Sequence, residues 1–203
     1  NSVYEYDFNT NESTLVSTGS SGNVGFDVDS NNQIHVLNSR QNNYQLIAEN
    51  GDLLDEFYSH RNAHEIIKTP DDDLLISGSI TKTLKLRDDG LMDLFIDDYG
   101  LDMQVVGNQL LYTTTNQLEI YDLNTLTMTE RLNPQVSNIT SIAANGDDLF
   151  VTSYYGLYHY DYVDAAELIM GFDRRIYDIE STNLGRVLMA AHNSGRVVEL
   201  LAD

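Results

Sequence analysis

Short apolar runs separated by polar turns extend along the whole chain. Residues 3–8, Val-Tyr-Glu-Tyr-Asp-Phe, alternate apolar and acidic side chains as a half-buried strand does, and a polar turn follows them. No window of about 12 residues carries the 3.6-residue period of an amphipathic helix. The best helical candidate, residues 164–172, falls in register with strands elsewhere in the chain, so we predict a strand there. The pattern predicts an all-β protein.

The strand pattern repeats along the chain. The segments "NQLEIYDLNTLTMTERL" and "SVYEYDFNTNESTLVST" both give a strand, an Asp, an Asn-Thr turn and a second strand. Further copies are "YQLIAENGDLLDEF", "TLKLRDDGLMDLFI", "GLYHYDYVDAAELIMGF" and the shorter "GRVVELLAD". The copies are spaced 41, 40, 34, 39 and 40 residues apart, as shown by the anchor residues Val3, Tyr44, Leu84, Leu118, Leu157 and Val197.

Two more strands precede each copy after the first, as in "ITSIAAN" followed by "DLFVTSY", so one unit holds four short strands in about 39 residues. Four strands at this period are typical of a β-propeller blade. We therefore predict one propeller domain over residues 1–203, with about five four-stranded antiparallel blades. The predicted blades are residues 23–61, 62–100, 101–138, 139–175, and 176–203 completed by 1–22.

Pairing of the N-terminal and C-terminal strands is expected to close the ring, because closure hides sticky edge strands. The strand count leaves one strand over, either residues 3–8 or residues 196–201. That surplus would suit a piece of a longer repeat array, an extra outer strand, or a strand that pairs with a neighbour. A chain that starts at Asn1 also leads us to expect that a signal peptide or a larger segment was removed upstream.

The copies "DDLFVTSYYGLYHYDYVDAAELI" and "NQLLYTTTNQLEIYDLNTLTMTE" resemble the YVTN and LVIVD repeat propellers. The resemblance covers essentially all 203 residues, but its motifs are loose, and the Trp-Asp signature of WD repeats is missing because the chain has no Trp. Such propellers are typical of exported bacterial and archaeal proteins. The resemblance thus implies the fold and an extracellular, cell-surface or periplasmic location, without implying a particular function.

The net charge of the chain limits the classes of binding partner. The chain has 32 acidic and 11 basic residues, for a net charge of −21, which repels nucleic acids and anionic lipid. No apolar run approaches the length of about 18 residues that a membrane-spanning helix needs, and the absence of Cys excludes disulfides and thiolate metal sites. We expect a protein or carbohydrate partner, no nucleic acid and no membrane insertion.

The connections on the two faces of the predicted propeller differ in residue composition. One face has short acidic turns such as "PDDD" and "NGDD". The other face gathers basic and aromatic residues, and we take it as the candidate ligand-binding face, against the simpler interpretation that exposed loops carry charges anyway. Its candidate residues are Arg40, His60, Arg61, His64, Glu65, Tyr154, Tyr155, Arg174, Arg175 and His192. Arg would supply forked donors to an acidic or hydroxylated ligand, and Tyr a stacking face.

Two segments contain metal-ligand residue types. His60, His64 and Glu65 could hold a divalent ion, but His-x3-His spacing indicates a metal mainly on a helix, and here it lies at a loop-to-strand junction. Asp27, Asp29 and Asn31 only faintly resemble a calcium loop, since its glycine and late glutamate are missing, so we expect a solvated turn. The sequence predicts no cofactor and no dedicated metal site, with weak binding of Ca²⁺ or another divalent ion as the alternative.

No phosphate-binding glycine loop, nucleophile elbow or catalytic triad spacing is present. The expected axial positions, including Glu65, Gln104, Ser141 and Asp178, are mixed in chemistry, which argues against a shared catalytic plan. We therefore predict a non-enzymatic binding or assembly module. The alternative is a hydrolase or lyase with an axial site of His60, His64, Glu65 and His192, with or without a metal.

Overall fold

The computed structural model describes residues 2–7, 10, 12–18, 24–38, 40–59, 62–78, 80–87, 89–146, 148–162, 165–172, 176–181, 187–191 and 196–200. Within these residues the chain forms 21 strands. Each strand coincides with one that the repeat pattern predicts, to within a few residues at its ends. The segment with the best helical pattern contains strand β18, Glu167–Gly171, so the prediction of a strand there is confirmed.

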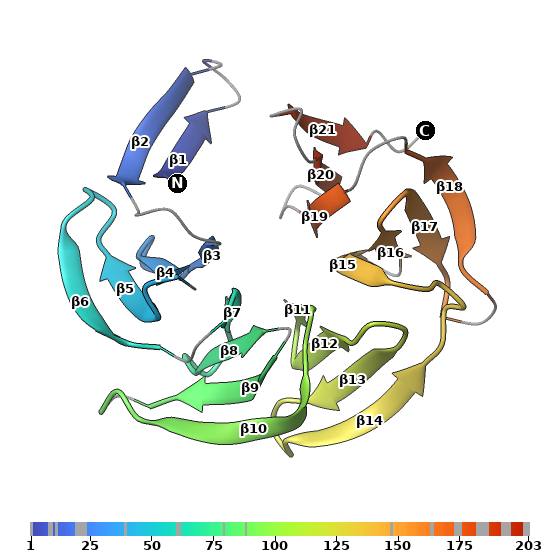
Figure 1. Cartoon of the computed structure of the whole chain (residues 1–203), viewed down its shortest axis with the longest axis horizontal. Coiled ribbons are helices and arrows are strands. Elements are labelled where there is room, and N and C mark those ends of the chain that lie inside the picture. Colours follow the sequence, from blue (N-terminus) through green and yellow to red (C-terminus); the bar gives the residue numbers. More distant parts are fainter. Residues whose placement is uncertain are drawn as a thin grey trace. The chain divides into compact units, whose positions relative to one another are not determined.

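The internal contacts divide the chain into two compact units, Asn1–Tyr99 and Gly100–Asp203, and each is described by itself. The first unit contains three antiparallel sheets (Figure 1). A two-stranded sheet pairs β1 (Ser2–Asp7) with β2 (Glu12–Thr18). The next sheet has the order β3 (Val24–Val28), β4 (Ile34–Asn38), β5 (Asn43–Ile47) and β6 (Leu53–Tyr58). The third has the order β7 (Glu65–Lys68), β8 (Leu74–Gly78), β9 (Thr81–Leu86) and β10 (Met92–Tyr99).

The second unit continues the same pattern with three further sheets. The first has the order β11 (Asp102–Val106), β12 (Gln109–Thr113), β13 (Leu118–Asp122) and β14 (Thr127–Leu132). The second has the order β15 (Ile139–Asn145), β16 (Asp148–Ser153), β17 (Gly156–Tyr160) and β18. The third contains β19 (Ile176–Ser181), β20 (Val187–Ala191) and β21 (Arg196–Leu200).

The chain is therefore an all-β, five-bladed β-propeller with mostly four-stranded antiparallel blades, as the sequence predicts. Among the described residues, four blades are complete and the last has three strands, while β1 and β2 form a pair of their own. Completion of the last blade by the N-terminal strands stays a prediction, as does the single domain over residues 1–203.

The core lies between neighbouring blades rather than inside any one sheet. In the first unit, Leu37 and Tyr44 of one blade pack in the same cluster as Ile66 and Ile76 of the next. In the second unit, Leu111 and Leu118 share a cluster with Ile139 and Leu149. Because both faces of a blade are covered, its second strand is mostly buried, and every residue of β8 is buried.

The first strand of each blade packs beside the first strand of the next blade within a unit, as β3 does with β7 and β15 with β19 (Figure 1). The approach is closest at Gly25 of β3, where an added Cβ would overlap the backbone carbonyl of His64. Only glycine fits there without moving the main chain.

No helix that could cross a membrane occurs in the described part of the chain.

Candidate functional site

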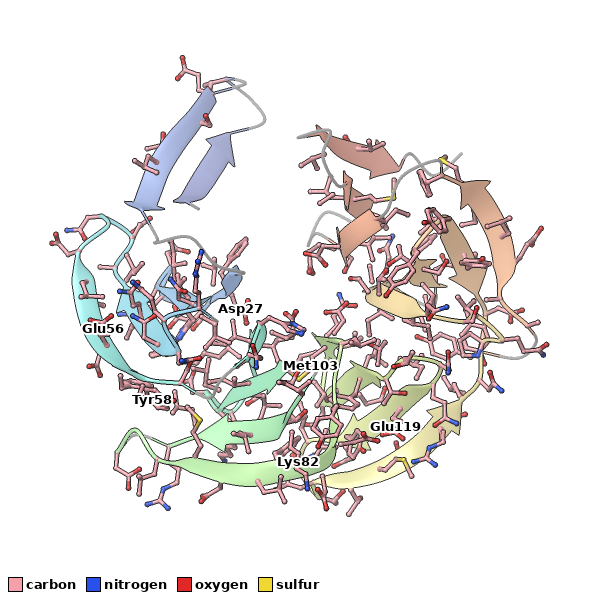
Figure 2. All side chains as sticks on the ribbon, in the orientation of Figure 1. Asp27, Glu56, Tyr58, Lys82, Met103 and Glu119 are labelled. Atoms are coloured by element: carbon pink, nitrogen blue, oxygen red, sulfur yellow. The ribbon has the colours of Figure 1, made fainter. Side chains whose placement is uncertain are left out.

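The first strands of neighbouring blades are tied by side chains that accept hydrogen bonds from the backbone of the next blade. Asp27 Oδ2 on β3 accepts the N–H of Lys68 on β7 at 2.6 Å, and Figure 2 labels Asp27 at this position. In the second unit, Asp102 Oδ2 accepts the N–H of Ile142 at 2.7 Å, and Gln104 Oε1 accepts that of Ala144 at 2.5 Å. These bonds satisfy backbone donors on the edge of a first strand that has no ladder partner in its own sheet.

Asp102 belongs to a larger polar group that links three blades of the second unit. Ser141, on β15, places its Oγ 2.6 Å from Asp102 Oδ2 and 2.9 Å from Asp178 Oδ1, on β19. The N–H of Ile179 also points to Ser141 Oγ at 3.2 Å. Asp102 and Ser141 are buried, whereas Asp178 is exposed. The buried part of the group therefore reaches solvent through Asp178.

The hydrogen bonds around Ser141 require a proton on one of the two carboxyls. A serine hydroxyl donates one hydrogen bond, yet two carboxyl oxygens lie within hydrogen-bonding distance of Ser141 Oγ. Both contacts are hydrogen bonds only if one carboxyl is protonated and donates to the serine oxygen. Asp102 accepts backbone N–H groups on both oxygens, from Met103 at 2.8 Å and from Ile142, which favours its ionised form. The shared proton is then best placed on Asp178.

The surroundings raise the proton affinity of both carboxyls. Burial and, to a smaller extent, the nearby charge of Asp178 together raise the pKa of Asp102 to about 7. The surrounding protein also desolvates Asp178 and raises its pKa, although this residue keeps an edge exposed to solvent. Two carboxyls that share one site do not both ionise readily, so the pair retains one proton near neutral pH.

The strand-to-strand bonds described above explain only part of this arrangement. Asp27 and Gln104 also accept a backbone N–H from the first strand of the next blade, so the bond from Ile142 to Asp102 has purely structural counterparts. The partly exposed Asp178, facing the same hydroxyl, has no such structural explanation. A buried acid joined through a hydroxyl to an exposed acid is an arrangement that can take up and release a proton at the surface.

A second buried polar cluster lies in the first unit. Tyr44 Oη lies 2.7 Å from His35 Nδ1, and His35 Nε2 faces Asp29 Oδ2 at 3.4 Å. Burial lowers the pKa of His35, so the ring is neutral at neutral pH. The Tyr44 hydroxyl then donates to Nδ1, and the Nε2 hydrogen points to the Asp29 carboxylate. This cluster is enclosed, and we assign it to stability.

The same cluster corrects one expectation about the segment that resembles a calcium loop. Asp29 Oδ1 caps a turn by accepting the N–H groups of Asn31 and Gln33, but Asp29 is buried rather than solvated. Sequence reasoning missed its burial because the partner, His35, comes from the following strand. Among the described residues, no group of three or more His, Asp or Glu side chains is placed to hold a metal ion.

The structure places five of the ten predicted face residues. Arg40 is exposed in the connection between β4 and β5, and its N–H donates to Asn38 Oδ1. His64 and Glu65 lie half-buried at the start of β7, and burial lowers the pKa of His64. Tyr154 and Tyr155 are exposed in the connection between β16 and β17.

The other five predicted residues, His60, Arg61, Arg174, Arg175 and His192, lie outside the described residues. The proposed convergence of His64, Glu65 and His192 therefore stays a prediction.

Sequence reasoning did not single out Asp102, and it treated Ser141 and Asp178 as evidence against a site. The signal was their spacing of 39 and 37 residues, close to one blade, with each residue near the start of a first strand. Aligning the first strands by blade rather than searching for local motifs would have grouped the three residues.

The chain matches no protein-family model, and no curated protein matches it in sequence. Its fold does match solved structures. Virginiamycin B lyase from Staphylococcus aureus superimposes with a TM-score of 0.64 at 12% identity, over 88% of this chain and 69% of the lyase chain. A streptogramin B lyase matches with a TM-score of 0.66 at 13% identity, over 100% of this chain and 77% of the lyase chain.

The class of protein is thus a β-propeller structurally similar to virginiamycin B lyase at low sequence identity. Identities of 12 and 13% show the fold alone, and no family is assigned. The resemblance to exported repeat propellers holds at the level of the propeller fold.

Proposed function

We propose that this protein is a lyase or hydrolase that uses Asp102, Ser141 and Asp178 for acid–base chemistry. The observation that carries the proposal is the single Ser141 hydroxyl within hydrogen-bonding distance of both carboxyls, which calls for a carboxyl proton. General acid–base catalysis works best when the pKa of the catalytic group lies near the working pH, and desolvation raises the pKa of both carboxyls of this pair toward neutrality.

The two acids have different roles in this proposal. Asp178 is exposed, so it is the group that contacts substrate and exchanges the proton. Asp102 is buried and acts through Ser141, holding the charge that remains when Asp178 carries the proton. Ser141 keeps the two carboxyls at a fixed separation, with its oxygen fixed by the N–H of Ile179.

The similarity in fold supports the reaction class, since both related structures are lyases by name. Elimination and hydrolysis both need an acid that protonates the leaving group, and Asp178 is the exposed group that can supply the shared proton. An acid pair with one proton can serve either reaction. The proposed reaction class is the hydrolase or lyase that the sequence offers as the alternative, but the proposed site consists of the two Asp residues and not of the His and Glu residues.

The test is turnover of virginiamycin B, the compound in the name of the related lyase, in water enriched in heavy oxygen. Hydrolysis places heavy oxygen in the product, whereas elimination does not, and mass spectrometry distinguishes the two. We expect Asp178→Asn to lower kcat by about 100-fold, the effect of removing a general acid or base. Asp71→Asn, in an exposed turn between β7 and β8, is the matched control and should leave kcat unchanged.

Two results would contradict the proposal in different ways. Absence of turnover by the unmodified protein would exclude this substrate class. An Asp178→Asn variant that turns over as fast as the unmodified protein would exclude the acid pair as the site.

One observation favours the non-enzymatic binding module as a second candidate. Tyr154 and Tyr155 are exposed side by side on the predicted binding face. Aromatic pairs of this kind are common at binding surfaces because one end of each side chain is apolar and the other is polar.

A further inference from the structure

A set of exposed connections lies at one end of the blades in the second unit. Two hydrogen bonds join the connection between β12 and β13 to the connection that leads into β15. The N–H of Asn138 donates to Asn116 Oδ1 at 3.2 Å, and the N–H of Ile139 donates to the Thr115 carbonyl at 2.9 Å. Ile139 pairs with Ser153 across the β15–β16 ladder, so Tyr154 follows at the same end. Three connections from two blades thus adjoin one another.

These connections have an unusual composition for this chain. Their exposed residues include Thr115, Asn116, Gln117, Ser137, Asn138, Tyr154 and Tyr155, and we call this set the amide–tyrosine face. None of its members is charged, although the protein has 32 acidic residues. At the opposite end of the same blades lie Asp122 at the end of β13, Asp148 at the start of β16 and Asp161 just after β17. The uncharged character is therefore local.

The two tyrosines are held in place rather than left at a loose tip. Their rings meet edge to face with centroids 6.4 Å apart, and the side chains are 37% and 63% exposed for Tyr154 and Tyr155. The Tyr155 carbonyl accepts the N–H of Phe172 at 2.7 Å. At Gly156, the first residue of β17, an added Cβ would lie 2.7 Å from the ring of Tyr158, so the strand after the tyrosines is closely packed. A fixed aromatic surface loses little entropy on binding.

We propose that the amide–tyrosine face binds a neutral oligosaccharide. A tyrosine ring can stack on the apolar face of a sugar, and the amides of Asn116, Gln117 and Asn138 can both donate to and accept from neighbouring hydroxyls. A polyanion is disfavoured by the net charge of −21, and none of the seven described residues named above carries a charge that would hold an ionic ligand.

The test uses three neutral linear hexaoses, cellohexaose, maltohexaose and chitohexaose, in isothermal titration calorimetry. Tyrosine fluorescence gives a second readout, because the chain has 13 Tyr and no Trp. We expect at least one hexaose to bind and Tyr155→Ala to weaken it by about three- to ten-fold, the effect of losing one stacked ring. Tyr155→Phe keeps the ring and should retain binding.

The matched control is Tyr58→Ala on β6, which removes an even more exposed ring (71%) from the first unit; Figure 2 labels this residue. It should leave hexaose binding unchanged, and urea unfolding of each variant shows that the fold is intact. Failure of all three hexaoses to bind at millimolar concentration would overturn the proposal. Equal binding by Tyr155→Ala and the unmodified protein would also overturn it, as would tighter binding of a hexauronate.

The proposal is independent of acid–base activity. Asp178→Asn should bind the hexaose as the unmodified protein does, so loss of turnover and loss of sugar binding report on different sites.

Discussion

Individual polar residues in this propeller are defined by what the neighbouring strand or blade places against them. Asp102 is buried, accepts two backbone N–H groups and faces Asp178 across the Ser141 hydroxyl. Asp71, by contrast, lies in an exposed turn. The proton affinity of Asp102 is raised by its surroundings and not by its local sequence.

The acid pair predicts a pH-dependent effect of Asp178→Asn on stability. The pKa of Asp102 is raised above its unfolded value, so the folded state binds more protons and its advantage is lost as pH rises from about 4 through 7. Removing the charge of Asp178 lowers the pKa of Asp102 and so reduces the stability that the folded state loses as pH rises. We expect the variant to exceed the unmodified protein in free energy of unfolding by about 1 kcal/mol at pH 8, a value reduced for the exposure of Asp178, and to match it near pH 4.

Urea denaturation at both pH values measures this difference, with Asp71→Asn as the control that should show none. A constant difference between the unmodified protein and Asp178→Asn at the two pH values would contradict the coupling of the two acids.

The buried histidine predicts a second residue-scale effect. Tyr44→Phe removes the hydroxyl that donates to His35 Nδ1 and leaves a buried acceptor without its partner. We expect a loss of about 1–3 kcal/mol in the free energy of unfolding. Tyr58→Phe removes a hydroxyl from an exposed residue and should change stability little. Equal stability of the two variants would show that the His35 contact contributes nothing.

At the scale of elements, close packing between the first strands of neighbouring blades holds the blades of a unit together. Gly25 of β3 leaves no space for a Cβ against the backbone at His64. Gly25→Ala must move one strand away from the other, and we expect a loss of about 3 kcal/mol or more, measured by urea unfolding. Gly171→Ala is the control, since the nearest atom to its added Cβ is 4.0 Å away. If Gly25→Ala were as stable as Gly171→Ala, the close packing of β3 on β7 would be wrong.

The strands could be predicted from the sequence because each carries its own period and is bounded by its own turn residues. Even β18, which has the best helical pattern, was predictable from its register with the other repeats. The acid pair was not, because Asp102 and Asp178 meet only when β11, β15 and β19 lie side by side. The burial of Asp29 was missed for the same reason, since His35 and Lys68 enclose it from other strands.

At the scale of the whole molecule, the strand inventory predicts that residues 1–22 complete the last blade. Strand β21 lies at the edge of a three-stranded sheet, where an edge needs a partner or protection. Deleting residues 1–22 should speed amide hydrogen exchange in Arg196–Leu200 by about ten-fold or more, because these amides lose bonded neighbours. Unchanged exchange in β21, with β8 as the internal reference, would contradict ring closure by the N-terminal strands.

The central claim is that Asp102 and Asp178 share one proton near neutral pH. Carbon-13 NMR of protein labelled at the aspartate carboxyl carbons measures the protonation of each group directly, with the pair assigned by Asp178→Asn. We predict that one carboxyl of the pair stays protonated at pH 6 and titrates near pH 7, and that Asp178→Asn shifts the remaining carboxyl to a lower pKa. Two carboxyls that are both fully ionised at pH 5 would contradict the claim.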